Sequence, residues 1–99
     1  MNVLFSKQED KTLKVTAFGA IDSVNAPDFL NQVTEKLPGI IKLVIDLKNV
    51  DYCSSAGLRS LLVLNDKMAE LGGMKMTGAN EILMKVFNET GLDEVFTLF

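Results

Sequence analysis

The sequence contains no histidine or tryptophan, one cysteine and two prolines in 99 residues. The absence of histidine excludes a Ser-His-Asp triad, a Cys-His pair and any metal site built on histidine. Cys53 has no second thiol with which to form an internal disulfide, which suits a reducing cytoplasm. Because most of the groups that enzymes use are missing, we expect no catalytic residue, no metal site and no cofactor.

Long apolar runs and an excess of positive charge are also absent. The longest wholly apolar run, at residues 61–64, is far below the roughly 20 residues of a membrane-spanning helix. The net charge of −3 and the pI near 4.8 have the wrong sign for binding nucleic-acid phosphates. We therefore expect a cytoplasmic protein with no membrane insertion and no direct contact with nucleic acid. The acidic balance favours a partner with a basic surface.

The hydropathy pattern predicts one α/β domain over residues 1–99, with its elements in the order ββαβαβαβ. A nearly continuous apolar run at 40–47 indicates a central parallel strand covered on both faces. Apolar residues at helical spacing predict three helices: one with Asn25 as its N-cap, one from Ser54-Ser55 to Leu71, and one at 81–90. The remaining strands are expected at 2–6, 12–18, 74–77 and 95–99. The result is a mixed β-sheet with packed helices.

Three segments follow predicted strands and precede predicted helices, namely 19–25, 48–55 and 78–80. If their strands are parallel neighbours, these loops lie at one edge of the sheet, where open α/β sheets build their sites. We therefore expect polar side chains from all three loops to lie close together, although they are far apart in sequence. These residues are Asp22, Ser54, Ser55 and Asn80.

Small residues at 54–57 leave the N-terminus of the second helix open, with free main-chain N–H groups. A negative charge at such a terminus is stabilised by roughly 0.3–1 kcal/mol. The fold would therefore tolerate a phosphate on Ser55, which would add about −2 charge to the surface. The residue pattern by itself favours a simpler interpretation, in which Ser54 is an N-cap and Ser55 an ordinary serine of the first turn.

Four segments in order resemble the STAS domain, and within it the stand-alone anti-sigma factor antagonists of bacteria. Ser-Ser-Ala-Gly-Leu at 54–58 resembles the phosphorylation motif of that family. Residues 19–22 resemble its Gly-x-Leu/Ile-Asp segment, and 45–50 resemble its third-strand exit. Residues 89–92 resemble the end of its third helix. Each segment alone is a weak signal, but the four together, at fitting spacings, are specific and span nearly the whole chain.

The resemblance implies that Ser55 is a phosphorylation site. It also implies a partner-binding surface that comprises Asp22, Ser23, Ser54, Ala56, Gly57 and Leu58. In this family the unphosphorylated protein binds an anti-sigma factor, usually also a serine kinase, which then releases its sigma factor. Phosphorylation breaks the complex and a separate phosphatase restores it. The alternative is a STAS subunit of a transporter or stress-signalling complex, with Ser55 only a constitutive contact.

Two aspartates have more than one interpretation. Asp22 either fixes the loop before the first helix or, as the resemblance implies, contacts the partner. Asp46 lies inside an apolar strand, and a strand-end carboxylate bonded to the backbone explains it more simply than a role in the site. If both lie near Ser55, their charges would repel a phosphate there. Ser54 stands where some members of the family have aspartate, a difference that bears on kinase recognition.

Overall fold

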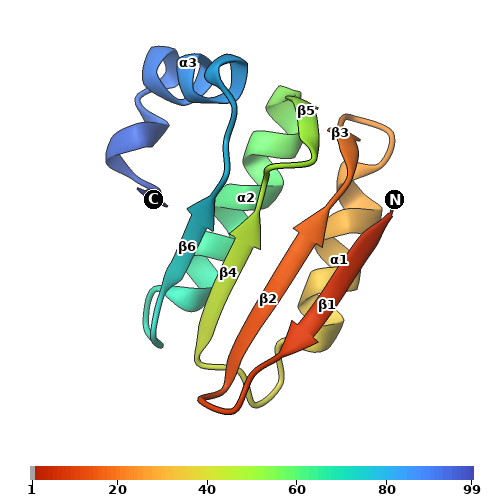
Figure 1. The fold of residues 1–99 in the computed structure, drawn as a ribbon, viewed down its shortest axis with the longest axis vertical. Helices are drawn as coiled ribbons and strands as arrows, with labels where there is room; N and C mark the ends of the chain where they lie inside the picture. Colours follow the sequence, from red (N-terminus) through yellow and green to blue (C-terminus); the bar gives the residue numbers. More distant parts are fainter. Residues whose placement is uncertain (1) are drawn as a thin grey trace.

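A five-stranded mixed sheet lies at the centre of the structure, a computed structural model that describes residues 2–99 (Figure 1). The first two strands run antiparallel, and every other neighbouring pair is parallel. The strands lie in the order β1 (Val3–Lys7), β2 (Thr12–Ala17), β4 (Lys42–Asp46), β6 (Met74–Thr77) and β7 (Thr97–Leu98). The predicted mixed α/β fold and the central parallel position of β4 are confirmed.

Two helices, α1 (Ala26–Lys36) and α2 (Ser55–Met68), cover one face of this sheet (Figure 1). The core between helices and sheet includes Phe29, Ile45 and Leu61, whose side chains are fully buried. The third helix, α3 (Glu81–Thr90), lies beyond the end of β6, where Phe87 meets Phe96 edge-to-face with ring centroids 5.6 Å apart. Its predicted bounds are confirmed, and Gly91 ends it in a left-handed conformation with φ 76.

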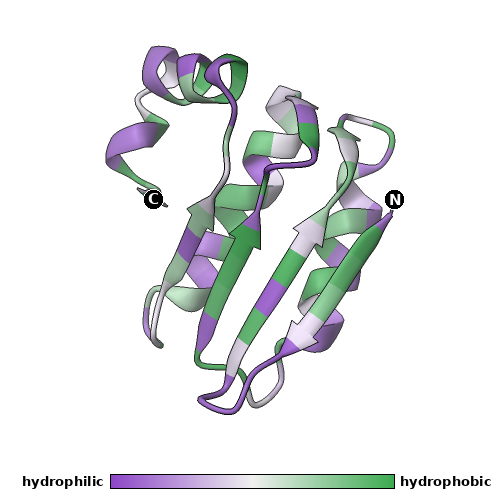
Figure 2. Cartoon of the chain, viewed as in Figure 1, coloured by the Kyte–Doolittle hydropathy of each residue, from purple (hydrophilic) through white to green (hydrophobic). Residues whose placement is uncertain are grey.

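No helix of residues 2–99 lies on the other face of the sheet, so the prediction that 40–47 would be covered on both faces is wrong (Figures 1 and 2). Within β4 the side chains alternate, with Leu43 buried and Lys42 and Val44 at least partly exposed. The apolar run seemed continuous because Ile40 and Leu47, which flank the strand, are buried in the adjoining turns. The run therefore joins two buried turn residues to an ordinary one-sided strand.

A second, two-stranded parallel sheet was not predicted. It pairs β3 (Gly19–Ile21) with β5 (Val50–Cys53), two segments expected to be loops. Gly19 has φ +84 and so turns the chain from β2 into β3 rather than ending the strand, and its N–H donates to the Asn49 carbonyl at 2.9 Å. The described order is therefore β1, β2, β3, α1, β4, β5, α2, β6, α3 and β7. A short 3₁₀ turn at Leu92–Glu94 precedes β7.

Several predicted element ends differ from the structure, and β1 spans Val3–Lys7 rather than 2–6. Helix α2 stops at Met68 rather than Leu71, because the following turn closes with the Gly73 N–H on the Met68 carbonyl at 3.0 Å. Strand β2 ends at Ala17 rather than 18. The last strand spans Thr97–Leu98 only, since the N–H groups of Val95 and Phe96 bond back to the Leu92 carbonyl and Phe96 is buried in the core.

Candidate functional site

Ser54 fixes the start of α2 on the small β3–β5 sheet. Its hydroxyl accepts a hydrogen bond from the Gly57 N–H at 3.2 Å, which makes it the N-cap of the helix. Its own N–H donates to the Ile21 carbonyl at 2.9 Å and so extends the ladder in which Ile21 pairs with Cys53. The predicted capping role is confirmed, and both polar groups of this residue are used within the fold.

Ser55 differs from Ser54 in both the exposure and the hydrogen bonding of its side chain. It is the first residue of α2, and its side chain is exposed. Within residues 2–99 no group hydrogen bonds to its hydroxyl. The hydroxyl therefore faces solvent at the N-terminus of a 14-residue helix, where the main-chain N–H groups and the helix dipole favour negative charge.

Gly57 allows the helix to pack this closely on the small sheet. A Cβ atom at this position would lie 2.6 Å from the Ile21 carbonyl oxygen and 2.7 Å from the Cys53 sulfur. Gly57 and Leu58 are both buried, so they support the site from below. Cys53 is buried too, and burial raises the pKa of its thiol to about 11. The thiol is thus a packing group that remains protonated at neutral pH.

Asp22 and Asn25 hold the loop between β3 and α1 by reciprocal hydrogen bonds. One carboxylate oxygen of Asp22, Oδ1, accepts from the N–H groups of Val24 and Asn25, each at 3.0 Å. The Asn25 side chain accepts from the Asp22 N–H at 2.9 Å and donates to the Ala20 carbonyl at 2.8 Å. Asn25 occupies the N-cap position of α1, but its side chain does not cap that helix; it points back toward β3 instead.

These bonds show that Asp22 organises the loop, and they leave its second carboxylate oxygen without a hydrogen bond to any residue in 2–99. Because Ile21 pairs with Cys53, the ladder brings Asp22 beside Ser54 and Ser55, as predicted. Asn80 joins the same end of the sheet at a different place. It caps α3 through the Leu83 N–H at 2.8 Å, and its amide donates to the carbonyl of Val50, at the opposite end of β5 from Ser54 (Figure 1).

Asp46 belongs to the open face of the sheet. Its side chain is buried and accepts from the Lys48 N–H at 3.0 Å, with the ammonium groups of Lys48 and Lys14 at 3.7 and 3.9 Å. This arrangement is the strand-end carboxylate bonded to the backbone that the sequence favoured. Two lysines compensate its negative charge, so the role of Asp46 is to stabilise the open face of the sheet.

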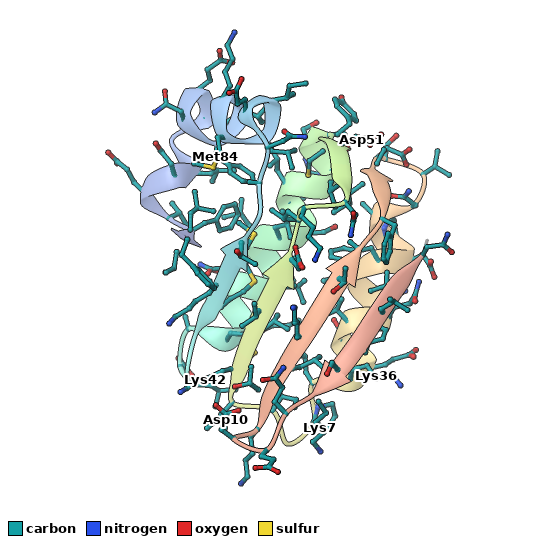
Figure 3. All side chains as sticks on the ribbon, viewed as in Figure 1. Lys7, Asp10, Lys36, Lys42, Asp51 and Met84 are labelled. Atoms are coloured by element: carbon teal, nitrogen blue, oxygen red, sulfur yellow. The ribbon has the colours of Figure 1, made fainter. Side chains whose placement is uncertain are left out.

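Sequence reasoning missed several exposed residues on the segments that adjoin the start of α2. Val24 on the β3–α1 loop is 88% exposed and Tyr52 on β5 is 53% exposed. Asp51, labelled beside β5 in Figure 3, is exposed as well. A groove of about 340 Å³ between α1 and α2 has Ser23 and Arg59 among its lining residues. The exposed aromatic two residues before Ser54 was the one sequence signal that could have indicated this surface.

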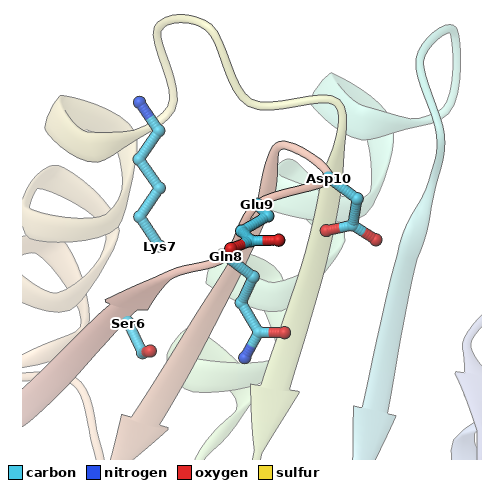
Figure 4. A pocket seen from close by; sticks show the side chains of 5 residues that line it. All are labelled: Ser6, Lys7, Gln8, Glu9 and Asp10. Atoms are coloured by element: carbon cyan, nitrogen blue, oxygen red, sulfur yellow. The ribbon is translucent and has the colours of Figure 1, made fainter.

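A polar hollow at the tip of the β1–β2 hairpin lies at the other end of the sheet and carries no comparable arrangement. It is formed by residues 6–10 alone, and Figure 4 shows the Lys7 side chain directed away from the carboxylates of Glu9 and Asp10. Within residues 2–99, no cluster of three or more potential metal ligands is present. In the same part of the chain, no helix has the length and apolar character to cross a membrane. The start of α2 therefore remains the candidate site.

Comparison with known proteins agrees with this geometry, since the model of the STAS domain matches residues 6–99. The chain belongs to the STAS domain family. The anti-sigma-B factor antagonist of Bacillus subtilis (strain 168) is 30% identical over 94 residues, which cover 93% of this chain and 85% of that protein. The chain thus falls with the anti-sigma factor antagonists of the family.

Solved STAS structures agree. The crystal structure of an anti-sigma factor antagonist from Mycobacterium paratuberculosis superimposes with a TM-score of 0.88 at 27% identity, covering 99% of this chain and 84% of that one. The anti-sigma factor antagonist SpoIIAA in its unphosphorylated form gives 0.82 at 13% identity, covering 99% and 88%. The phosphorylated form of SpoIIAA from Bacillus gives 0.74 at 13% identity, covering 99% and 91%. At such identity SpoIIAA shows the shared fold alone.

Proposed function

We propose that this STAS domain is an anti-sigma factor antagonist switched by phosphorylation of Ser55. In its unphosphorylated form it binds an anti-sigma factor that is also a serine kinase, and the sigma factor is released. One observation carries the proposal: the Ser55 hydroxyl is exposed and unbonded, whereas the adjacent Ser54 hydroxyl is bound to the helix. The fold is compatible with such a switch, because SpoIIAA, which shares the fold, has been solved in a phosphorylated form. A separate phosphatase would reset the switch.

The surface around Ser55 is suited to a partner that offers apolar and basic groups. Val24, on the β3–α1 loop, and Tyr52, on β5, supply exposed apolar area on the two segments that adjoin the motif. Asp22 has an unused carboxylate oxygen and Asp51 is exposed, so a partner arginine or lysine would find carboxylates beside that apolar area. The chain's negative net charge agrees with this.

Within the proposed contact set, position in the fold separates two roles. Asp22, Ser23, Ser54 and Ala56 are at least partly exposed and would touch the partner. Gly57 and Leu58 are buried, so their part would be to hold the α2 terminus in place. Binding would therefore depend on both sets. Gly57 and Leu58 would act on it only through stability, whereas Asp22 and Ser54 would both touch the partner and hold local structure by their hydrogen bonds.

The proposed switch follows from charge. A phosphate on Ser55 would place about two negative charges in the partner interface, on the same side of the β3–β5 sheet end as the Asp22 carboxylate. Burying such a group without a new cation costs several kcal/mol. A loss of about 3–4 kcal/mol weakens binding by roughly 10²–10³-fold. The domain itself would stay folded, because the helix N-terminus stabilises negative charge.

The test uses purified kinase-type anti-sigma factors from the same genome, each titrated with the wild-type chain and two variants. Ser55→Ala should keep wild-type affinity, and Ser55→Asp should bind about 10–100-fold more weakly, since one carboxylate carries less charge than phosphate. Thermal unfolding of the two variants should agree within a few degrees. If Ser55→Asp binds as tightly as Ser55→Ala, the switch is refuted.

Phosphopeptide mapping of the protein from its own cells, in growth and under stress, provides the second arm. Phosphate on Ser55 that varies with condition is the expected result. If Ser55 is unmodified in every condition, a constitutive STAS subunit becomes the better explanation. Phosphate on Ser54 instead would show that Ser55 is not the switch residue. It would also contradict the role of the Ser54 hydroxyl as a helix cap.

A further inference from the structure

Strand β1 is an unprotected edge of the central sheet. It pairs only with β2, and Figure 1 shows no element beyond it. Its five residues contain no proline and no register shift, and their single charge is Lys7 at the end. Proteins ordinarily shield such an edge with mid-strand charges, bulges, proline or a covering segment. The opposite edge, β7, is only two residues long and exposes far less.

The main-chain groups that β1 leaves free can be identified from its pairing with β2. The Phe18 N–H donates to the Asn2 carbonyl at 3.2 Å, and the Gln8 N–H donates to the Thr12 carbonyl at 2.8 Å. In an antiparallel pair, bonded and non-bonded residue pairs alternate along the strand. The even-numbered residues of this strand therefore bond to β2. The N–H and C=O groups of Val3, Phe5 and Lys7 point away from the sheet.

We propose that a second copy of this chain pairs with β1 in antiparallel orientation, about a two-fold axis at Phe5. In this register Val3 faces Lys7 of the other copy and Phe5 faces its counterpart. In this register the free N–H and C=O groups of all three outward residues are paired, with two main-chain hydrogen bonds for each of the three facing pairs. No other antiparallel register centred within the strand pairs all three. The edge is therefore self-complementary, which favours a second copy over an unrelated strand.

The side chains are compatible with this register. Lys7 faces Val3 rather than another charge, so no like charges oppose each other along the seam. The Phe5 ring lies on the helix-covered face, with the Lys36 ammonium 5.6 Å from its centroid. The like charges nearest the axis are therefore the two Lys36 ammonium groups, each over the ring of its own copy. Figure 3 shows Lys36 beside β1. Leu4, 62% exposed on the open face, would lie opposite Ser6 of the other copy.

The proposed pairing leaves the candidate site open. Because the two β1 strands run in opposite directions, the end of the sheet that carries Ser55 in one copy points away from that end in the other. Each copy could then bind its own partner. A single pair of strands buries less surface than a standard protein interface, so the dimer should be weak and form at roughly 0.1–1 mM.

Disulfide trapping tests the register directly, in a Cys53→Ser background that removes the buried thiol. Phe5→Cys should form a covalent dimer under mild copper-catalysed air oxidation, since facing residues of a bonded pair lie about 5.5 Å apart at Cα. Leu4→Cys and Ser6→Cys should each dimerise about tenfold more slowly alone, because like residues would lie about 7–8 Å apart. Mixed together, they should form a mixed disulfide quickly.

Positions 4 and 6 are exposed, so the mixing arm does not depend on replacing a packed residue. Equal rates for all combinations would mean random collision and overturn the proposal. Sedimentation equilibrium of the wild-type chain up to about 1 mM provides an independent measurement. A monomer throughout would also overturn it and leave the edge for a strand of another protein. Neither readout depends on Ser55, so both are independent of the phosphorylation switch.

Discussion

The two ends of the sheet are held together in different ways. At the end that carries Ser55, segments far apart in sequence hold each other: the Ser54 N–H bonds to the Ile21 carbonyl, and Gly57 packs against β3. At the other end, the β1–β2 turn closes with the Gln8 N–H on the Thr12 carbonyl at 2.8 Å, and its link to a distant segment is main-chain only: the Lys11 carbonyl accepts from the Ile41 N–H at 2.9 Å. All four residues of the turn at 8–11 are exposed.

This difference indicates where a substitution should cost little stability. The side chains of the hairpin turn are exposed, and its bond to the segment before β4 is made by the main chain, so a side-chain substitution in the turn should have a small and local effect. The Ser55 end depends on contacts between β3, β5 and α2, so a substitution there should move several elements together. A surface that must fit a partner is best built on such an end, because its shape is set before the partner arrives.

The largest expected effect comes from adding a side chain at Gly57. Gly57→Val places atoms where a Cβ already meets the Ile21 oxygen at 2.6 Å and the Cys53 sulfur at 2.7 Å. We expect a loss of about 2–3 kcal/mol in the free energy of unfolding, measured by urea denaturation. The matched change at the other end is Lys11→Gly, which relieves a positive φ of 63 and should stay within about 0.5 kcal/mol. Equal losses in the free energy of unfolding would refute the proposed difference between the two ends.

Removing one carboxylate from the loop at each end, in separate variants, should show the same difference in stability. Asp22→Ala deletes an acceptor of two N–H bonds at the Ser55 end and should cost about 1–2 kcal/mol. Asp10→Ala deletes an exposed acceptor in the hairpin and should cost less than about 0.5 kcal/mol. Chemical denaturation of both variants measures the difference. Only the first should also broaden the amide resonances of α2, since only that loop adjoins β5; unchanged α2 resonances in Asp22→Ala would refute the coupling.

The sequence was sufficient to predict what periodicity and capping encode. The one-sided alternation of β2, the three helices and the Ser54 cap all leave residue-level patterns, and each is confirmed. Asp46 could also be placed, because a carboxylate inside an apolar strand needs backbone donors. The convergence of Asp22 with Ser54 and Ser55 followed from the parallel order of the strands.

What could not be predicted depends on long-range pairing. Strands β3 and β5 have three and four residues, too few for a period to show, and they form because each supplies the other's hydrogen bonds. Asn25 has the residue type of a helix cap, but the Ala20 carbonyl and the Asp22 N–H compete for its side chain. The bare face of β4 was hidden because buried turn residues extend its apolar run.

Substituting Ser54 and Ser55 one at a time separates the effect on stability from the effect on phosphorylation. Ser54→Ala loses the bond to the Gly57 N–H and should cost about 1 kcal/mol. Ser55→Ala removes an exposed, unbonded hydroxyl and should change the free energy of unfolding by less than about 0.5 kcal/mol. Phosphate incorporation by a cognate kinase should show the opposite order, lost in Ser55→Ala and retained in Ser54→Ala. Equal stability losses would mean that the cap contributes nothing.

A smaller effect is expected from the thiol beneath this end. Burial raises the pKa of Cys53 from 9.0 to about 11, so between these values the folded chain keeps a proton that the unfolded chain releases. The unfolded state binds fewer protons there, and the free energy of unfolding must fall as pH rises through this window. Urea denaturation at several alkaline pH values should show wild type losing stability relative to Cys53→Ala. A constant difference would show that the thiol is not shielded.

The smallest effect lies at the hairpin end. A hydrogen bond from the Thr12 side chain, together with the Thr12 N–H at 3.2 Å, lowers the pKa of the Asp10 carboxyl below 3.8. The stability this bond contributes is present above that value and is lost as pH falls through the lower folded pKa. Thr12→Val should raise the Asp10 pKa in a carboxyl carbon NMR titration while the amide resonances of Ser54 and Ser55 stay in place. Movement of those resonances would mean that the two ends are coupled through the sheet, so that the hairpin could not be treated as a local turn.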